Sequence, residues 1–370
     1  MFSRRSFLAL AAAGALALGV AACGDDDSGS GGATTTAGGG ATTAASSGTT
    51  AASSEPVTLR LGYFGNVTHA PAIVGVRQGF FEEALADNVT LDASKTFNAG
   101  PSAIEALFGG AIDATFIGPN PAINGYAQSK GEALRIVGGS TSGGAFLVTK
   151  PDITSPEQLK GKKIATPQLG NTQDVALRAW LKEQGFSSTT TGGGDVSVVP
   201  QENAQTLETF KAGEIDGAWL PEPWASRLIQ EAGAKVLVDE RDLWPDGRYV
   251  TTHLIVSTKF LNEHPDVVKQ LLTGLVKSIE WINENPDEAK KITNEGIEQI
   301  TQKPLGQELM DAAWANLEFT YDPVASSLQK SADDAIEAGL LDPVDLSGIY
   351  DLTLLNEVLA EAGLEAVNDL

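Results

Sequence analysis

Cysteine and histidine are scarce in this chain of 370 residues, which has one cysteine, Cys23, and three histidines, His69, His253 and His264. A single cysteine excludes an intrachain disulfide and a zinc site built from thiolates. The three histidines do not follow the spacing of a metal-binding motif. We therefore expect neither a metal ion nor another cofactor.

Basic residues are also few: 25 lysines and arginines stand against 48 aspartates and glutamates, a formal net charge of −23. Nucleic-acid-binding proteins need a basic surface, so this charge argues against nucleic acid as a partner. The Gly-x-Ser-x-Gly motif of serine hydrolases is missing as well, and we expect no enzyme activity. An anion is still an allowed ligand, because backbone dipoles can bind one inside an acidic protein.

The apolar run near the start, from Ala9 to Val20, is shorter than the roughly 20 residues that a membrane-spanning helix needs. It follows Arg4-Arg5 and leads to small residues before Cys23, which is the order of a bacterial export signal. We therefore predict a signal peptide over 1–22. The ending Val-Ala-Ala-Cys resembles the lipobox of bacterial lipoproteins, which implies lipidation of Cys23, and the paired arginines resemble a twin-arginine signal.

Residues 24–54 are almost entirely Gly, Ala, Ser and Thr. Such a segment has too little apolar surface to offset the entropy of ordering it. We predict that 23–55 is a flexible linker between a lipid anchor in the membrane and a globular body.

Strand and helix patterns alternate along the body, which predicts an α/β fold with largely parallel sheets. Two halves repeat the order strand, helix, strand, helix, strand, and each third strand follows a Gly-x-Ile-Asp turn. In the first half, Ser102 is expected to cap a helix over 103–108, with Glu105 completing a capping box. The predicted strands are 57–63, 89–97, 113–117, 163–166, 196–199 and 217–220, and the other predicted helices are 70–79, 173–184 and 204–212.

Two further strand patterns predict a hinge. Residues 145–149 read as a strand that crosses to the second half, and 252–257 as the strand that returns. We expect one lobe from 56–147 plus 250–370 and a second from 148–249. Two crossings between two lobes leave a cleft that can close on a ligand.

Several stretches, in this order, resemble the solute-binding proteins of ABC transporters for nitrate, taurine and aliphatic sulfonates. The resemblance implies a type II periplasmic-binding-protein fold and delivery of a solute to a membrane permease. It is carried by Leu61-Gly62-Tyr63-Phe64, His69-Ala70-Pro71, Gln78-Gly79-Phe80-Phe81, residues 113–121 (DATFIGPNP), residues 159–165 (LKGKKIA) and residues 213–224 (GEIDGAWLPEPW).

Ligands of open α/β sheets bind beyond the carboxyl ends of the strands, where helix N-termini offer free N–H groups and a partial positive charge. Asn120-Pro121 and Asn171-Thr172 read as helix starts at such ends. No arginine lies at these ends, which favours a small, singly charged oxyanion. The candidate ligand-binding residues are Asn66, Thr68, His69, Gly118, Asn120, Ser142, Asn171, Thr172, Gln173, Trp219 and Glu222.

For two of these candidates, Trp219 and Glu222, the sequence leaves two roles possible. Either Trp219 or Trp224 is expected to line the cleft, while the other lies in the core. Glu222 has two alternatives: it pairs with a ligand ammonium, as taurine would require, or it fixes the cleft wall by accepting backbone N–H groups.

The sequence thus predicts a monomeric lipoprotein on the outer face of the cytoplasmic membrane. It is expected to capture an anionic or zwitterionic solute (an aliphatic sulfonate, taurine or nitrate) for an ABC permease. Two alternatives stay open: a protein that binds a thiamine-precursor-like pyrimidine or, with less support, an enzyme acting on it, and a sensor subunit that reports the ligand.

Overall fold

The computed structural model describes residues 55–369. These described residues form one compact unit. The predicted signal peptide, the lipidation site Cys23 and nearly all of the predicted linker lie outside the described residues. Within the described part of the chain, no helix is both long and apolar enough to cross a membrane.

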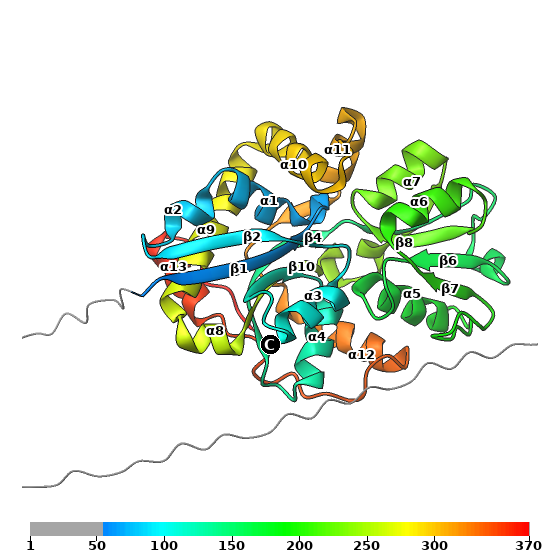
Figure 1. The fold of residues 1–370 in the computed structure, drawn as a ribbon. Coiled ribbons are helices and arrows are strands. Elements are labelled where there is room, and N and C mark those ends of the chain that lie inside the picture. The colour runs from blue at the N-terminus through cyan, green and yellow to red at the C-terminus, as the bar shows by residue number, and fades with distance from the viewer. Residues whose placement is uncertain (1–54, 370) are drawn as a thin grey trace, which may run out of the picture. The chain divides into compact units, whose positions relative to one another are not determined.

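Six strands form the larger sheet, in the order β11-β4-β10-β3-β1-β2 (Figure 1). β1 pairs in parallel with β2 and β3, whereas β10 runs antiparallel to β3 and β4. Helices cover both faces of this sheet, so its central strands are buried on both sides; Leu59 and Leu61 of β1 are fully buried. The strands are β1 (Val57–Phe64), β2 (Val89–Phe97), β3 (Ala114–Ile117), β4 (Leu134–Gly143), β10 (Val250–Ser257) and β11 (Leu317–Phe319).

Helices from both ends of the described chain pack on the larger sheet, and together they form the larger lobe. Figure 1 shows α1, α2 and α10 above the sheet and α3, α4 and α8 below it. The helices are α1 (Ala70–Arg77), α2 (Phe80–Ala84), α3 (Gly100–Phe108), α4 (Pro119–Gln128), α8 (Thr258–Glu263), α9 (Pro265–Glu284), α10 (Pro286–Thr301), α11 (Gln307–Trp314), α12 (Leu328–Glu337) and α13 (Thr353–Glu361).

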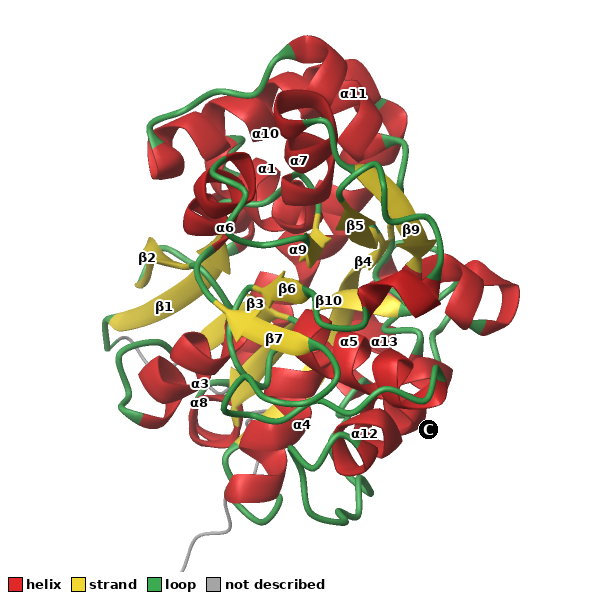
Figure 2. Cartoon of the chain, turned by 90° about the vertical axis from the view of Figure 1, so that its right-hand side faces the viewer, coloured by secondary structure: helices red, strands yellow, loops and turns green. Residues whose placement is uncertain are grey.

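Five strands form the second sheet, in the order β7-β6-β8-β5-β9. Seen from its own side, this smaller lobe has α6 and α7 on one side of the sheet and α5 on the other (Figure 2). Its core is accordingly divided in two, with Phe210 and Trp224 in one part and Trp180 and Trp219 in the other. The elements are β5 (Ala145–Thr149), β6 (Lys163–Thr166), α5 (Thr172–Glu183), β7 (Ser197–Pro200), α6 (Asn203–Lys211), β8 (Gly217–Pro221), α7 (Trp224–Ala232) and β9 (Lys235–Asp239).

The alternation predicted from the sequence matches these elements closely, and the two-sheet α/β fold is confirmed. The expectation of largely parallel sheets was wrong: β5, β10 and β11 run against their neighbours, so five of the nine strand pairings in the described chain are antiparallel. One local prediction was wrong. α3 begins at Gly100 after the N-cap Ala99, so Ser102 lies inside the first turn and caps nothing; its Oγ lies 3.4 Å from the Gln168 side-chain oxygen instead. Pro101 explains the earlier start, because proline is well accommodated in the first turn of a helix.

The chain leaves the larger sheet at Gly143-Gly144 and returns to it at β10. Both glycines have positive φ, 80° and 75°, a conformation that side-chain-bearing residues rarely adopt. All of β5 then pairs in the smaller sheet and all of β10 in the larger one. The lobe boundaries at 147/148 and 249/250 stay a prediction.

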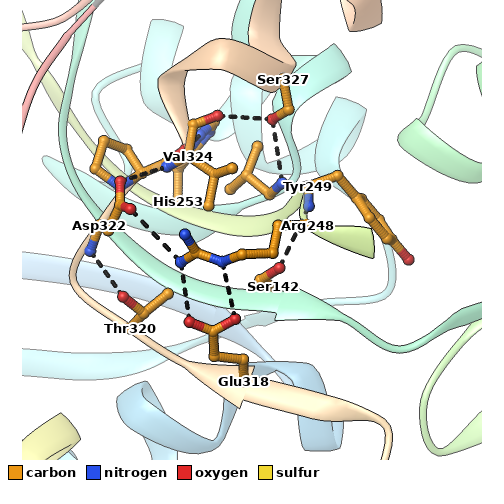
Figure 3. Close-up of polar contacts among 11 residues, drawn as sticks. Ser142, Arg248, Tyr249, His253, Glu318, Thr320, Asp322, Val324 and Ser327 are labelled. Carbon is orange, nitrogen blue, oxygen red and sulfur yellow. Dashed lines mark hydrogen bonds and ion pairs between the residues drawn. The ribbon is translucent and has the colours of Figure 1, made fainter. Parts of the chain in front are cut away.

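Figure 3 shows the polar contacts beside the returning segment. Arg248 pairs with Glu318 of β11 at 2.9 Å and with Asp322 at 3.5 Å. The Asp322 carboxylate also accepts the backbone N–H of Val324 at 2.9 Å. Val324 has φ 46°, which is costly for a β-branched residue. The Asp322 contact therefore holds a strained turn against the strand that re-enters the larger sheet.

Two of the three histidines are buried without charge. His69 and His253 are 2% and 0% exposed, and desolvation lowers the pKa of each to about 3. The His253 Nε2 lies 3.3 Å from the carbonyl oxygen of Pro323, which fits a neutral ring with the proton on Nε2. Burial also disfavours the charged form of Glu240, and for a carboxyl group this raises the pKa, here to about 7.

These shifts predict how stability depends on pH. The unfolded His253 binds a proton below about pH 6.5 and the folded one only below about pH 3, so it disfavours the native state increasingly as pH falls. The cost is about 1 kcal/mol per pH unit between pH 6 and 4. Glu240 has a raised pKa, so its effect on stability changes with pH in the opposite sense. The quantity to measure is therefore the difference in unfolding free energy between the His253→Gln variant and the wild type, in which the effect of Glu240 cancels. In urea unfolding, we expect the unfolding free energy of the variant to rise by about 2 kcal/mol relative to that of the wild type from pH 6 to pH 4. If the difference in unfolding free energy does not change with pH, the buried, neutral ring is contradicted.

Candidate ligand-binding site

Residues beyond the carboxyl ends of strands in both sheets meet at one small cavity of about 30 Å³. The larger lobe contributes the segments after β1, β2 and β3 and part of β10. The smaller lobe contributes the segments after β6, β7 and β8. The lining residues are Phe64, Asn66, Thr68, His69, Asn98, Ala99, Gly100, Gly118, Pro121, Pro167, Asn171, Thr172, Gln173, Asn203, Pro221, Thr251 and Thr252.

Seven of the eleven candidates from the sequence lie at this cavity, and the structure brings them together from distant parts of the chain. They are Asn66, Thr68, His69, Gly118, Asn171, Thr172 and Gln173. Strand order explains the meeting, because the carboxyl ends of parallel strands lie at one edge of each sheet. Whether they contact a ligand stays a prediction.

α5 directs its N-terminus at the cavity. Asn171 is its N-cap, and the Asn171 side-chain oxygen accepts the N–H of Asp174 at 2.9 Å, as predicted. The N–H groups of Thr172 and Gln173 belong to the first turn, where no intrahelical acceptor exists. The start of α5 also approaches Gly118 of the larger lobe so closely that a Cβ there would lie 2.3 Å from Thr172 Oγ1. A side chain at this position would require Thr172 to move, so the close approach favours glycine.

His69 is oriented as a hydrogen-bond donor. Its Nδ1 accepts the backbone N–H of Phe64 at 3.4 Å, and the ring stacks on Phe64 with 4.3 Å between centroids. Because the ring is neutral and Nδ1 accepts, the proton lies on Nε2. A group in the cavity would meet an N–H donor without a formal charge.

Asn203 lies at the first position of α6 and is 1% exposed. Its side-chain Oδ1 has no hydrogen-bond partner among the described residues. A buried amide without a partner is costly, so this end of the side chain is suited to a ligand. Since the amide oxygen and nitrogen can exchange places by a flip, Asn203 can offer an acceptor or a donor.

Among the described residues that line the cavity, none is charged. The nearest fixed charges on α5 neutralise each other: Arg178 Nε lies 3.0 Å from Asp174 Oδ2, and both side chains are buried. Asp174 is held further by the Thr166 hydroxyl at 2.8 Å and the Gly170 N–H at 3.0 Å. Within residues 55–369, no group of three or more His, Cys, Asp or Glu side chains is placed to hold a metal ion.

Asn120 and Ser142 were expected at the site but lie elsewhere. The predicted helix had Asn120 as its cap and Pro121 as its first residue, but α4 has Gly118 as its N-cap and starts at Pro119, two residues earlier, so Asn120 is the second helical residue. Its side chain is buried and donates to the carbonyl oxygen of Ser331 at 2.7 Å. Ser142 is an interior residue of β4, and its hydroxyl accepts the N–H of Tyr249 at 3.4 Å.

Trp219 and Glu222 also lie away from the cavity. Trp219 is a core residue whose indole N–H donates to Glu240 at 2.7 Å. The Glu222 carboxylate is 1% exposed and already accepts the N–H and hydroxyl of Ser226, at 3.1 and 2.8 Å, and the Asn316 amide at 2.8 Å. Of the two alternatives for Glu222, the contacts therefore favour the structural one.

The cavity includes polar residues that the sequence analysis missed, chiefly Asn98, Asn203 and Thr252. Asn98 directly follows β2, and Asn203 lies three residues after the end of β7. Both could have been identified by looking for polar residues beyond the carboxyl ends of these parallel strands. Thr252 belongs to β10, an antiparallel strand to which this argument does not apply.

The segment that carries Thr68 and His69 is attached to the hinge strands by one carbonyl group. The Thr68 carbonyl oxygen accepts the hydroxyl of Thr141 in β4 at 2.8 Å and that of Thr252 in β10 at 3.1 Å. β4 leads to the first crossing and β10 follows the second. The Thr68 carbonyl therefore joins a segment at the cavity to both strands that flank the crossings.

A larger cavity, of about 1,000 Å³, lies elsewhere, beside Val57 at the amino end of β1 and Asp113 before β3. Its lining comes only from the larger lobe, and it receives no free helix N-terminus from a parallel strand end. Size alone does not make it the better candidate.

Comparisons with known proteins agree with this geometry. Residues 52–295 match the NMT1-like family. A Bacillus subtilis protein named for the binding of aliphatic sulfonates is 27% identical over 299 residues, which cover 79% of this chain and 86% of that protein. The taurine-binding periplasmic protein of Escherichia coli is 29% identical over 186 residues, 50% of this chain and 55% of that protein.

Solved structures share the fold. The alkanesulfonate-binding protein SsuA of Xanthomonas axonopodis, bound to MOPS, superposes with a TM-score of 0.63 at 22% identity, over 78% of this chain and 96% of that one. The nitrate-binding protein NrtA of Synechocystis superposes with a TM-score of 0.66 at 17% identity, over 83% and 89%. The predicted periplasmic-binding-protein fold is thereby confirmed.

Replacing Thr252 by valine tests the Thr68 contact. The change preserves shape but removes one of the two hydroxyl donors to a buried carbonyl group, and we expect a loss of about 1 kcal/mol of unfolding free energy in urea. Thr273→Val is the matched control, since that hydroxyl donates to a carbonyl on an exposed helix face and its loss should change stability by less than about 0.5 kcal/mol. Equal losses of unfolding free energy in the two variants would show that the hydrogen bond to the Thr68 carbonyl stabilises the protein no more than an exposed one.

Proposed function

We propose that this chain, which belongs to the NMT1-like family, is the solute-binding component of an ABC importer and captures a small organic or inorganic oxyanion outside the cell. The observation that carries the proposal is the cavity between the lobes, where neutral donors and the N-terminus of a 12-residue helix surround a space without charged residues. The relatives named above for sulfonates, taurine and nitrate support the same class of solute.

The donor set is sufficient for useful affinity. A dissociation constant of 1 μM corresponds to about −8 kcal/mol. Hydrogen bonds to a charged partner contribute roughly 1.5–3 kcal/mol each. Four donors, from His69, Thr172, Asn203 and the first turn of α5, would supply roughly 6–12 kcal/mol before the costs of association. A cation is therefore not needed for a singly charged anion.

Binding rather than catalysis is the proposed role. The cavity offers hydrogen-bond donors but no side-chain nucleophile paired with a base, because His69 is neutral and its acceptor nitrogen is occupied by Phe64. The pyrimidine alternative has less support. The two aromatic rings at the cavity, Phe64 and His69, stack on each other and not on either side of a free space.

We extend the proposal to the predicted export. A lipidated Cys23 would keep the protein on the outer face of the cytoplasmic membrane, within reach of a permease. Full-length protein expressed in a bacterial host should fractionate with membranes and incorporate labelled palmitate. Cys23→Ala should lose both properties, whereas Ser30→Ala in the same segment should keep them. Palmitate labelling of Cys23→Ala would contradict the assignment.

Calorimetric titration of the purified protein tests the function. The panel contains nitrate, taurine, methanesulfonate, sulfate and a thiamine-precursor pyrimidine, and we expect a singly charged oxyanion to bind. Thr172→Ala should weaken that binding by about 1–3 kcal/mol if the anion accepts the Thr172 hydroxyl, because Thr172 lines the cavity. Thr353→Ala is the matched control, since Thr353 is likewise the first residue of a helix but lies on α13, outside the cavity.

Asn203→Asp separates an anion site from a site for neutral ligands. It keeps the size of the side chain and puts a carboxylate into a cavity that has no cation to pair with it. Binding of an anion should then fall at least a hundredfold, with the melting temperature of the free variant as the check on folding. Undiminished anion binding, or binding of the pyrimidine alone, would overturn the proposal.

A further inference from the structure

A groove on the larger lobe is lined by the aromatic side chains of Trp314, Phe319 and Tyr321, and we call it the aromatic groove. Its volume of about 490 Å³ lies in the range of roughly 300–1,000 Å³ that is typical of pockets for small molecules. The end of α9, the start of α10, the end of α11, and β11 with the two residues after it form the groove. All of these belong to the larger lobe, so the shape of the groove does not depend on the smaller lobe.

The aromatic rings leave surface free for another molecule. Phe319 is buried, whereas Trp314 and Tyr321 are only partly buried. The Trp314 and Phe319 rings contact each other, with 4.6 Å between their centroids and 55° between their planes. Trp314 is therefore held in place by a core residue. The faces of tryptophan and tyrosine rings attract cations, and tryptophan does so most strongly.

Aliphatic side chains form much of the remaining lining, among them Ile279, Ile282 and Leu317. They offer no hydrogen bond to a strongly hydrated cation, such as a metal ion or a primary ammonium. Such a cation would lose water without replacement, which is costly. A quaternary ammonium has no N–H group to satisfy and presents methyl groups to the lining. The groove therefore suits a methylated cation better than a small inorganic one.

The charges at the groove also favour a cation. Within residues 55–369, the carboxylate of Glu280 has no hydrogen bond or ion pair. Glu318, the other acidic residue in the lining, is paired with Arg248 at 2.9 Å (Figure 3). Burial raises the pKa of Tyr321, and the charges of three carboxylates, that of Glu280 first, raise it further. Among the described residues that line the groove, none is a lysine or an arginine.

We propose that the aromatic groove binds a small organic cation of the quaternary ammonium class. The methyl groups contact the rings of Trp314 and Tyr321, and the Glu280 carboxylate balances the charge. This inference goes beyond the proposed function and does not rest on it. No residue of the groove lines the small cavity between the lobes, which we call the polar cavity.

Choline and its neutral analogue, in which a carbon atom replaces the nitrogen, test the need for charge because they have the same shape. The purified protein, isotope-labelled at the indole nitrogens, is titrated with each and observed by NMR. The Trp314 signal is identified by its loss in Trp314→Leu. We expect choline to shift this signal saturably, with an affinity at least fivefold higher than that of the neutral analogue.

Two results of this titration would overturn the proposal. Equal affinities for choline and the neutral analogue would show that the groove does not select a cation. If choline leaves the Trp314 signal unchanged, or shifts only another indole signal, it does not bind in the groove.

Variants on α9 and after β11 locate the cation. Glu280→Gln should weaken choline binding at least threefold. Glu284→Gln, the matched control, removes an exposed carboxylate one turn later on α9 and outside the groove, and should change binding less than twofold. Tyr321→Leu should weaken binding at least threefold, whereas Tyr321→Phe, which keeps the ring, should not.

The melting temperature of each free variant checks that it is folded. If Glu280→Gln and Glu284→Gln have the same effect on choline, the cation responds only to the overall negative charge of the protein. The proposed site would then be wrong.

Discussion

The carbonyl group of Thr68 connects the candidate site to the hinge. It accepts one hydroxyl from β4 and one from β10, at 2.8 and 3.1 Å, and these strands flank the two places where the chain passes between the lobes. The same short segment places His69 and Asn66 at the polar cavity. The buried Thr68 carbonyl oxygen therefore holds the cavity segment against both strands that flank the crossings. Unlike an exposed hydrogen bond, it cannot exchange its partners for water at little cost.

Electrostatics at the cavity rest on dipoles and neutral donors, although the chain as a whole carries a formal charge of −23. Asp174 in the first turn of α5 would repel an anion, but its pairing with Arg178 at 3.0 Å in a buried position cancels most of that field. The positive end of the helix dipole is left for the ligand. A site of this kind suits one negative charge. A doubly charged anion would need a cation that none of the described lining residues supplies.

The sequence was sufficient for the parts of the site that follow strand order. Seven candidates meet because each follows a parallel strand, and the N-cap Asn171 could be identified from its own residue type. The failures concern contacts over long separations. Asn120 donates to Ser331, 211 positions later, and Glu222 accepts from Asn316, 94 positions later. Neither partner leaves a local signal, so the sequence could not show that both side chains are already hydrogen-bonded within the protein.

Direct hydrogen bonds between the lobes already favour the closed form before a ligand binds. Trp224 and Asn66, Asn98 and Pro167, and Asn316 and Glu222 join the lobes directly, at 2.8–3.3 Å. Each such bond has a net worth of about 1 kcal/mol, so together they favour closure by a few kcal/mol at most. A solute adds only its differential affinity for the closed form, and moving a population from 1:99 to 99:1 takes about 5.5 kcal/mol. A solute that accepts hydrogen bonds from residues of both lobes at the polar cavity would gain affinity only when the lobes approach.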